Sequence, residues 1–126
     1  MASILCVDDD PDAVALKQHI LQDAGHAVTA CVSADQALFE LDNRSFDAVV
    51  TDWRLGNGVA SAVIERAKSR ARVPVIVVSG FVCEAFQAAA PLADLYLEKP
   101  VDPKELVSML ETLLQGRPRS SASSAR

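Results

Sequence analysis

Three aspartates stand where apolar runs of the sequence end, and they are the residues best suited to chemistry. Asp8 and Asp9 follow the run Ser3–Val7, and Asp52 follows Val49–Thr51. Carboxylates at close quarters repel one another, and burial strengthens the repulsion. A divalent cation relieves it, and oxygen ligands without histidine or thiolate favour a hard ion. If the fold brings the three acids together, the sequence predicts a site for Mg²⁺ or Mn²⁺.

Two further polar residues also follow apolar runs. Ser79 comes after Val75–Val78, and Lys99 comes shortly after Leu95–Leu97. A carboxylate beside Mg²⁺ can attack phosphorus and form an aspartyl phosphate. Because charge spreads over the phosphoryl oxygens in the transition state, a lysine and a hydroxyl nearby would stabilise it. We therefore expect phosphoryl chemistry at Asp52, with Lys99 and Ser79 assisting.

The elements that must position these residues alternate along the chain. Strands are expected at Ser3–Val7, His26–Cys31, Phe46–Thr51, Val75–Val78 and Leu95–Leu97, and helical patterns begin near Asp12, Ser33, Val63, Glu84 and Asp102. Crossovers of helical length imply a parallel sheet covered on both faces, an α/β fold. Ligands of such sheets bind beyond the carboxyl ends of the strands, so the polar residues should share one edge.

Several local patterns make more specific predictions. The first helix should bury a stripe containing Ala13, Leu16, Ile20, Leu21 and Ala24. Ser33 and Gln36 form a capping box for the second helix. The segment Glu84–Ala90 is poor in large apolar residues and is expected to be the least firmly packed helix. Trp53 is expected to be half-exposed beside the site.

Length, charge and cysteine usage bound the class of protein. The 126 residues predict one domain over residues 1–115 and a disordered tail over 116–126. A net charge of −5 disfavours direct binding of nucleic acid. No apolar run is long enough for a membrane span, and no secretory signal is visible. The odd, widely spaced Cys6, Cys31 and Cys83 are expected to be buried thiols in a reducing cytoplasm.

Four motifs in this order resemble the receiver domain of response regulators in two-component signal transduction. They are Ile-Leu-Cys-Val-Asp-Asp-Asp-Pro at 4–11, Thr-Asp-Trp-Arg-Leu at 51–55, Val-Ile-Val-Val-Ser-Gly at 75–80 and Tyr-Leu-Glu-Lys-Pro at 96–100. The resemblance covers about residues 2–115. It implies a flavodoxin-like, doubly wound sheet of five parallel strands in the order 2-1-3-4-5.

The resemblance also implies roles for individual residues. Asp52 would accept a phosphoryl group from a histidine kinase or a phosphotransfer protein. Mg²⁺ would be held by Asp8, Asp9, Asp52 and the backbone carbonyl of Arg54. Ser79 and Tyr96 would form the switch, Arg54 and Phe81 would tune dephosphorylation, and the Lys99–Pro100 bond would be cis.

A receiver of this kind catalyses only its own phosphorylation and dephosphorylation, so it is not expected to be an enzyme toward other substrates. Its output would be a contact with a downstream protein, and a homodimer through the fourth helix, fifth strand and fifth helix is a further expectation. The loop after the acceptor departs from the family, with Gly56 where proline is usual and Ala60 where glycine is common.

Two other functions compete with this prediction. One is a small Mg²⁺-dependent phosphatase of the haloacid dehalogenase type, with Asp8 as nucleophile and Asp10 as general acid. Asp12 stands where that type usually has Thr or Val, and no later acidic pair follows Lys99. The other is a pseudo-receiver that docks to partners without being phosphorylated.

Overall fold

The computed structural model describes residues 2–56, 58–71, 73–80 and 93–116. The elements in chain order are β1 (Ser3–Val7), α1 (Pro11–Asp23), β2 (Ala27–Cys31), α2 (Ala34–Asn43), β3 (Ala48–Asp52), β4 (Arg54–Leu55), β5 (Gly58–Val59), α3 (Ser61–Arg66), the π-helical turn η1 (Ala67–Ala71), β6 (Val75–Ser79), β7 (Leu95–Glu98) and α5 (Pro103–Gly116). The helix expected at 84–90, Phe81 and residues 117–126 of the expected tail lie outside the described residues. Gly116, expected to begin the tail, is the last residue of α5. Every other expected element is present, and the expected strands agree to within two residues at their ends.

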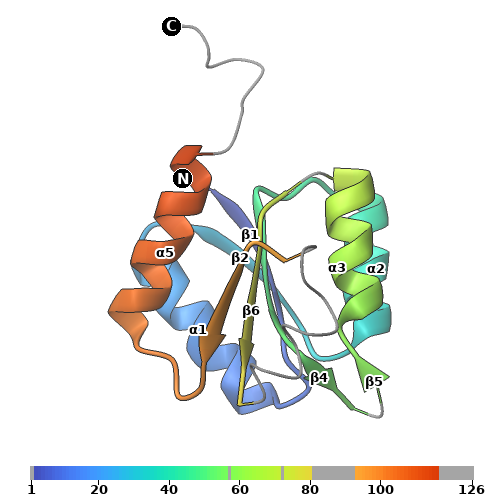
Figure 1. The fold of residues 1–126 in the computed structure, drawn as a ribbon, viewed down its shortest axis with the longest axis horizontal. Helices are drawn as coiled ribbons and strands as arrows, with labels where there is room; N and C mark the ends of the chain where they lie inside the picture. Colours follow the sequence, from blue (N-terminus) through green and yellow to red (C-terminus); the bar gives the residue numbers. More distant parts are fainter. Residues whose placement is uncertain (1, 57, 72, 81–92, 117–126) are drawn as a thin grey trace, which may run out of the picture.

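The five long strands form one parallel sheet in the order β2-β1-β3-β6-β7. This order confirms the predicted 2-1-3-4-5, because β4 and β5 pair only with each other in a separate hairpin. Figure 1 shows α1 and α5 on one face of the sheet and α2 and α3 on the other. The fold is therefore the doubly wound, flavodoxin-like arrangement that the sequence predicted.

Side chains of the central strands alternate between two cores. Leu5, Val49 and Val77 belong to the core under α2 and α3. Their neighbours in the chain, such as Val50 and Val78, belong to the core under α1 and α5. Burial on both faces explains why these strands read as continuous apolar runs in the sequence.

Helix α1 is rotated relative to the sequence prediction. Leu16, expected in the buried stripe, is 60% exposed, whereas Val14, Lys17 and Leu21 are buried. The helix begins at Pro11 because the side chain of Asp10 caps it, accepting a hydrogen bond from the amide of Asp12 at 3.0 Å. With this face buried, the long side chain of Lys17 points toward Asp8 at the end of β1.

Helix α2 begins as the sequence predicted. The amide of Gln36 donates to Ser33 Oγ at 3.1 Å. Gln36 Oε1 in turn accepts from the amide of Val32 at 2.8 Å, one residue before the cap. The first contact satisfies an open amide of the first helical turn, and the second satisfies the amide of the residue before the cap.

The hairpin of β4 and β5 was not predicted. Arg54 pairs with Val59 and Leu55 pairs with Gly58. Gly56 adopts a φ of 61°, the left-handed region that glycine reaches without strain. Two-residue strands are too short for a periodic pattern, so this segment appeared in the sequence only as a loop.

Candidate metal centre

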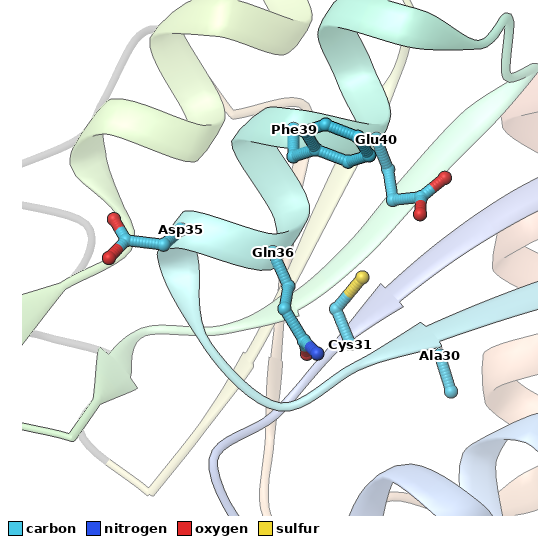
Figure 2. Close-up of a pocket in the computed structure, with 6 residues that line it drawn as sticks. All are labelled: Ala30, Cys31, Asp35, Gln36, Phe39 and Glu40. Carbon is cyan, nitrogen blue, oxygen red and sulfur yellow. The ribbon is translucent and has the colours of Figure 1, made fainter.

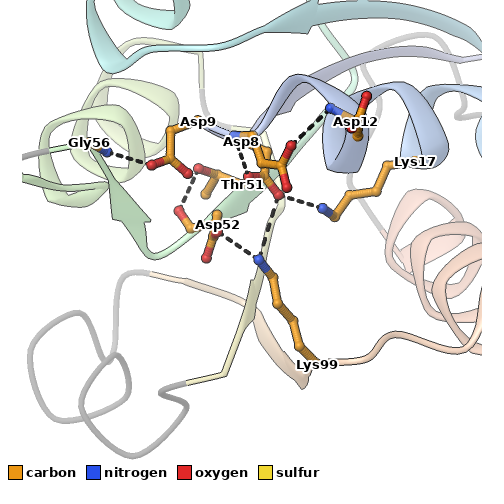
Figure 3. Close-up of polar contacts among 9 residues, drawn as sticks. Asp8, Asp9, Asp12, Lys17, Thr51, Asp52, Gly56 and Lys99 are labelled. Carbon is orange, nitrogen blue, oxygen red and sulfur yellow. Dashed lines mark hydrogen bonds and ion pairs between the residues drawn. The ribbon is translucent and has the colours of Figure 1, made fainter.

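Three carboxylates meet at the carboxyl edge of the sheet, where they were predicted. Asp8 and Asp9 directly follow β1, and Asp52 is the last residue of the neighbouring strand β3. Each offers one oxygen, and these oxygens lie within 4.8 Å of one another (Figure 3). Opposite ligands of an octahedral Mg²⁺ lie roughly 4.2 Å apart, so the separation and the oxygen chemistry suit a hard divalent ion.

Asp8 is the most enclosed of the three acids, with a relative exposure of 1%. Its Oδ1 accepts from the amide of Asp10 at 3.0 Å, and its Oδ2 accepts from Lys17 Nζ at 2.7 Å. Lys99 Nζ lies 3.6 Å from the same Oδ2. Burial raises the pKa of Asp8, but the lysines and the Asp10 amide outweigh it and leave the pKa below its ordinary value. Asp8 is therefore a carboxylate in the folded protein.

Lys99 contacts the predicted acceptor directly. Its Nζ donates to Asp52 Oδ2 at 2.7 Å. The amide of Lys99 donates to the carbonyl of Ser79 at 3.1 Å, which extends the pairing of β6 and β7. Partial burial lowers the pKa of Lys99, but the hydrogen bond and charge of Asp52, with those of Asp8, raise it above its ordinary value. The Lys99–Pro100 bond is cis, as the resemblance implied.

Asp9 connects the site to the unexpected hairpin. The amide of Gly56 donates to Asp9 Oδ2 at 3.0 Å (Figure 3). The hairpin also places Arg54 two residues beyond Asp52, and its carbonyl remains a predicted ligand. Trp53, between them, is 2% exposed, so the expectation of a half-exposed indole was wrong. The side chain faces the core under α2 and α3 instead of the solvent at the edge.

The two predicted switch residues lie on the strands beyond β3. Ser79 ends β6 and is fully buried; the residue before it, Val78, pairs with Asp52. Tyr96 lies on β7 opposite Val77, packs against the core under α2 and α3, and has a pKa raised by burial. Strands β6 and β7 run parallel to β3 and lie next to it in the order β3-β6-β7. Their carboxyl ends therefore lie at the same edge of the sheet as Asp52, as predicted.

Sequence reasoning missed Lys17. The residue is 4% exposed and pairs with Asp8 from α1. A signal was present, because Val14, Lys17 and Leu21 are spaced by three and four residues, the period of a buried helix face. A cation on such a face, one helix away from an acidic strand end, is the pattern that could have identified it.

Two surface hollows can be described from the residues that the structure describes, and one of these two touches the site. A hollow of about 390 Å³ is lined by Lys17 and Lys99 together with apolar residues of α1, β6 and the segment after β7. The other, of about 480 Å³, lies between β2 and α2 around the exposed Phe39 (Figure 2). Gln36 there is engaged in helix capping, and burial raises the pKa of Cys31 to about 11, so its thiol is protonated at neutral pH. This second hollow contains none of the predicted site residues.

Comparison with known proteins shows the family of the chain. Residues 4–111 match the response regulator receiver domain. The chain belongs to this family. It is a receiver domain of the kind found in the response regulators of two-component systems. Among the residues that the structure describes, no helix is both long and apolar enough to cross a membrane.

Three similar proteins illustrate the range of the family. The chain is 32% identical to an uncharacterised 14.6 kDa protein of Leptolyngbya boryana, covering 86% of each chain. It is 31% identical to the transcriptional regulatory protein TcrA of Mycobacterium tuberculosis, covering 91% of this chain and 47% of TcrA. A CheY-like receiver domain from Methanospirillum hungatei JF-1 superposes with a TM-score of 0.81 at 26% identity, covering 92% of this chain and 95% of the other. The chain thus spans about half the length of TcrA, and it covers 86% of the Leptolyngbya protein and 95% of the Methanospirillum chain.

Proposed function

We propose that this receiver domain accepts a phosphoryl group on Asp52 and uses it to change a protein-binding surface. The observation that carries the proposal is the contact of Lys99 Nζ with Asp52 Oδ2 at 2.7 Å, beside two further carboxylates. Membership of the family supports a histidine kinase or a phosphotransfer protein as the phosphoryl donor.

The transfer is a displacement at phosphorus. A carboxylate oxygen of Asp52 bonds to phosphorus while the bond from phosphorus to the histidine nitrogen breaks, and the imidazole leaves with that electron pair. Lys99, already hydrogen-bonded to Asp52, is near enough to neutralise charge on the phosphoryl oxygens. Ser79, at the end of β6, would donate a hydrogen bond to one of them. The chain acts on itself and returns to its starting form when water removes the phosphoryl group.

Asp8, Asp9 and Asp52 would hold Mg²⁺, or Mn²⁺ in its place, with the carbonyl of Arg54 completing the protein ligands. When bound, such an ion would supply positive charge beside the three carboxylates and offset the repulsion among them. The oxygen-only donor set of these residues supports this assignment.

The phosphatase alternative is less compatible with the contacts. Asp8 is nearly inaccessible, and both of its oxygens already accept hydrogen bonds, so it is a poor nucleophile. Asp10 caps α1 as a hydrogen-bond acceptor, which is unsuited to a general acid. Within the described part of the chain, the side chain of Asp52 contacts Lys99 and caps no helix.

The output would come from Ser79 and Tyr96. Movement of Ser79 toward a phosphoryl group, with Tyr96 turning inward, would shift the surface around β7 and α5 between two packings. That surface is where we place the downstream partner and the predicted homodimer contact. Arg54 and Phe81 remain predicted to tune the lifetime of the phosphoryl group.

Incubation with Mg²⁺ and acetyl phosphate, read by intact mass, tests the proposal. The wild type should gain one phosphoryl group, and Asp52→Ala should gain none. Asp35→Ala, an exposed aspartate on α2, is the matched control and should behave as the wild type. Label on Asp52→Asn that is lost in Asp8→Asn would favour the phosphatase, and no label on any variant would favour the pseudo-receiver.

A further inference from the structure

Lys17 is a buried cation that the proposed function does not use. Its side chain is 5% exposed, and its Nζ lies 2.7 Å from Asp8 Oδ2, whose side chain is 1% exposed. Figure 3 shows it reaching from α1 toward the carboxylates from a direction different from that of Lys99. Removing an ammonium from water is costly unless it is paired, so Asp8 holds Lys17 in this position.

A metal ion at this site would share Asp8 with Lys17. Asp8 is one of the three acids whose oxygens lie within 4.8 Å of one another. An ion that binds Asp8 is therefore separated from the Lys17 ammonium by a single carboxylate group. Two cations this close repel each other, and the low exposure of Lys17 limits screening by water.

The helix restricts how far Lys17 can withdraw. Its backbone belongs to the second turn of α1, whose neighbours Val14 and Leu21 on the same face are packed in the core. Lys99 differs, because its side chain is 36% exposed and follows the end of a strand. It can move aside into solvent, whereas Lys17 stays near Asp8 when an ion enters.

We propose that Lys17 is a resident counter-cation that weakens Mg²⁺ binding and holds Asp8 in place when no metal is bound. It is a positioning residue that acts through Asp8. The inference rests on the proposed metal site and adds to it a residue that sets its affinity.

Titration of the full chain with Mg²⁺ tests the role of the charge. Binding is read by calorimetry and by the fluorescence of Trp53, the single tryptophan, which adjoins Asp52. Lys17→Gln removes the charge but keeps a hydrogen-bond donor, and Lys17→Met removes both. Both variants should bind Mg²⁺ about tenfold or more tightly than the wild type. Lys17→Arg, which keeps the charge, should stay within about twofold of the wild type.

Lys68→Gln is the matched control. Lys68 Nζ also lies 2.7 Å from an aspartate oxygen, that of Asp94, but away from the site. Its Mg²⁺ affinity should equal that of the wild type. Unchanged or weaker binding in Lys17→Gln, equal tightening in Lys17→Arg, or no binding in any variant would overturn the inference.

A second measurement, the unfolding temperature, tests the inference even if Lys17→Gln is less stable than the wild type. Raising Mg²⁺ should increase the unfolding temperature of Lys17→Gln more than that of the wild type, because the ion replaces the missing positive charge. An equal increase would contradict the proposal. Neither measurement needs phosphorylation, so a chain that binds Mg²⁺ in this way but takes no label at Asp52 would refute the proposed function alone.

Discussion

Two lysines approach the same oxygen of Asp8 from different surroundings. Lys17 comes from the packed face of α1, and Lys99 comes from the exposed segment after β7. The first contacts Asp8 at 2.7 Å, and the second contacts Asp52 at 2.7 Å and Asp8 only at 3.6 Å. We therefore expect the two equal charges to have different roles. Lys17 would stabilise the metal-free fold, and Lys99 would remain available to an incoming anion.

The largest expected effect concerns Lys17, the buried lysine of the pair. Lys17→Met should lower the free energy of unfolding in EDTA by about 3 kcal/mol, because it leaves Asp8 buried without its closest cation. Denaturant unfolding followed by circular dichroism measures the change. Adding Asp8→Asn should restore most of the loss, since no buried charge then lacks a partner. A double variant whose losses simply add would show that the two residues do not act as a pair.

Substitution of Lys99, the exposed lysine, should change the rate of phosphorylation more than the free energy of unfolding. Lys99→Met should slow phosphorylation of Asp52 by acetyl phosphate roughly 100-fold, because a positioned positive charge is lost from the transition state. Its free energy of unfolding should change by less than about 1 kcal/mol, as for other exposed ion pairs. Time courses of intact mass and denaturant unfolding measure the two effects. A large loss of stability without a change in rate would show that Lys99, like Lys17, mainly stabilises the metal-free fold.

The smallest expected effect concerns how the free energy of unfolding changes at acidic pH. The pKa of Asp8 is lower in the folded protein than its ordinary 3.8, so the unfolded chain takes up the proton first as the pH falls. The stabilisation is present above about pH 5 and disappears as the pH drops through the lower folded value. Unfolding free energies measured in EDTA between pH 7 and pH 3 should fall less steeply for Asp8→Asn than for the wild type. Parallel curves would place the acid sensitivity elsewhere.

Much of the fold and site could be predicted because strand ends in a parallel sheet are visible in the sequence. Apolar runs ending in Asp8, Asp52, Ser79 and Lys99 indicated both the strands and the shared edge. Lys17 escaped this reasoning because a lysine in an amphipathic helix is normally solvated, and only the rotation of α1 against the sheet turns it inward. The spacing of Val14, Lys17 and Leu21 is compatible with a buried helix face, but so is the spacing of the predicted stripe. Packing between distant segments decides between the two faces.

The burial of Trp53 and the β4–β5 hairpin were missed for a related reason. Both depend on how the chain leaves β3. Gly56 turns the chain back there, and its amide donates to Asp9, which follows the neighbouring strand β1. A contact between residues 47 positions apart leaves no local pattern. The prediction therefore succeeded for strands, whose signal is local, and failed for the irregular segment that surrounds the acceptor.

The alternation of side chains along β3 limits how the length of this strand can change. Val50 faces the layer of α1 and α5, and Val49 faces the opposite layer. Inserting one residue within β3 would exchange these two layers for every position beyond it, and Asp52 would point away from Asp8. Insertions and deletions can accumulate in the connections between elements. Between Ala48 and Asp52, only a change by an even number of residues keeps each side chain on its face of the sheet.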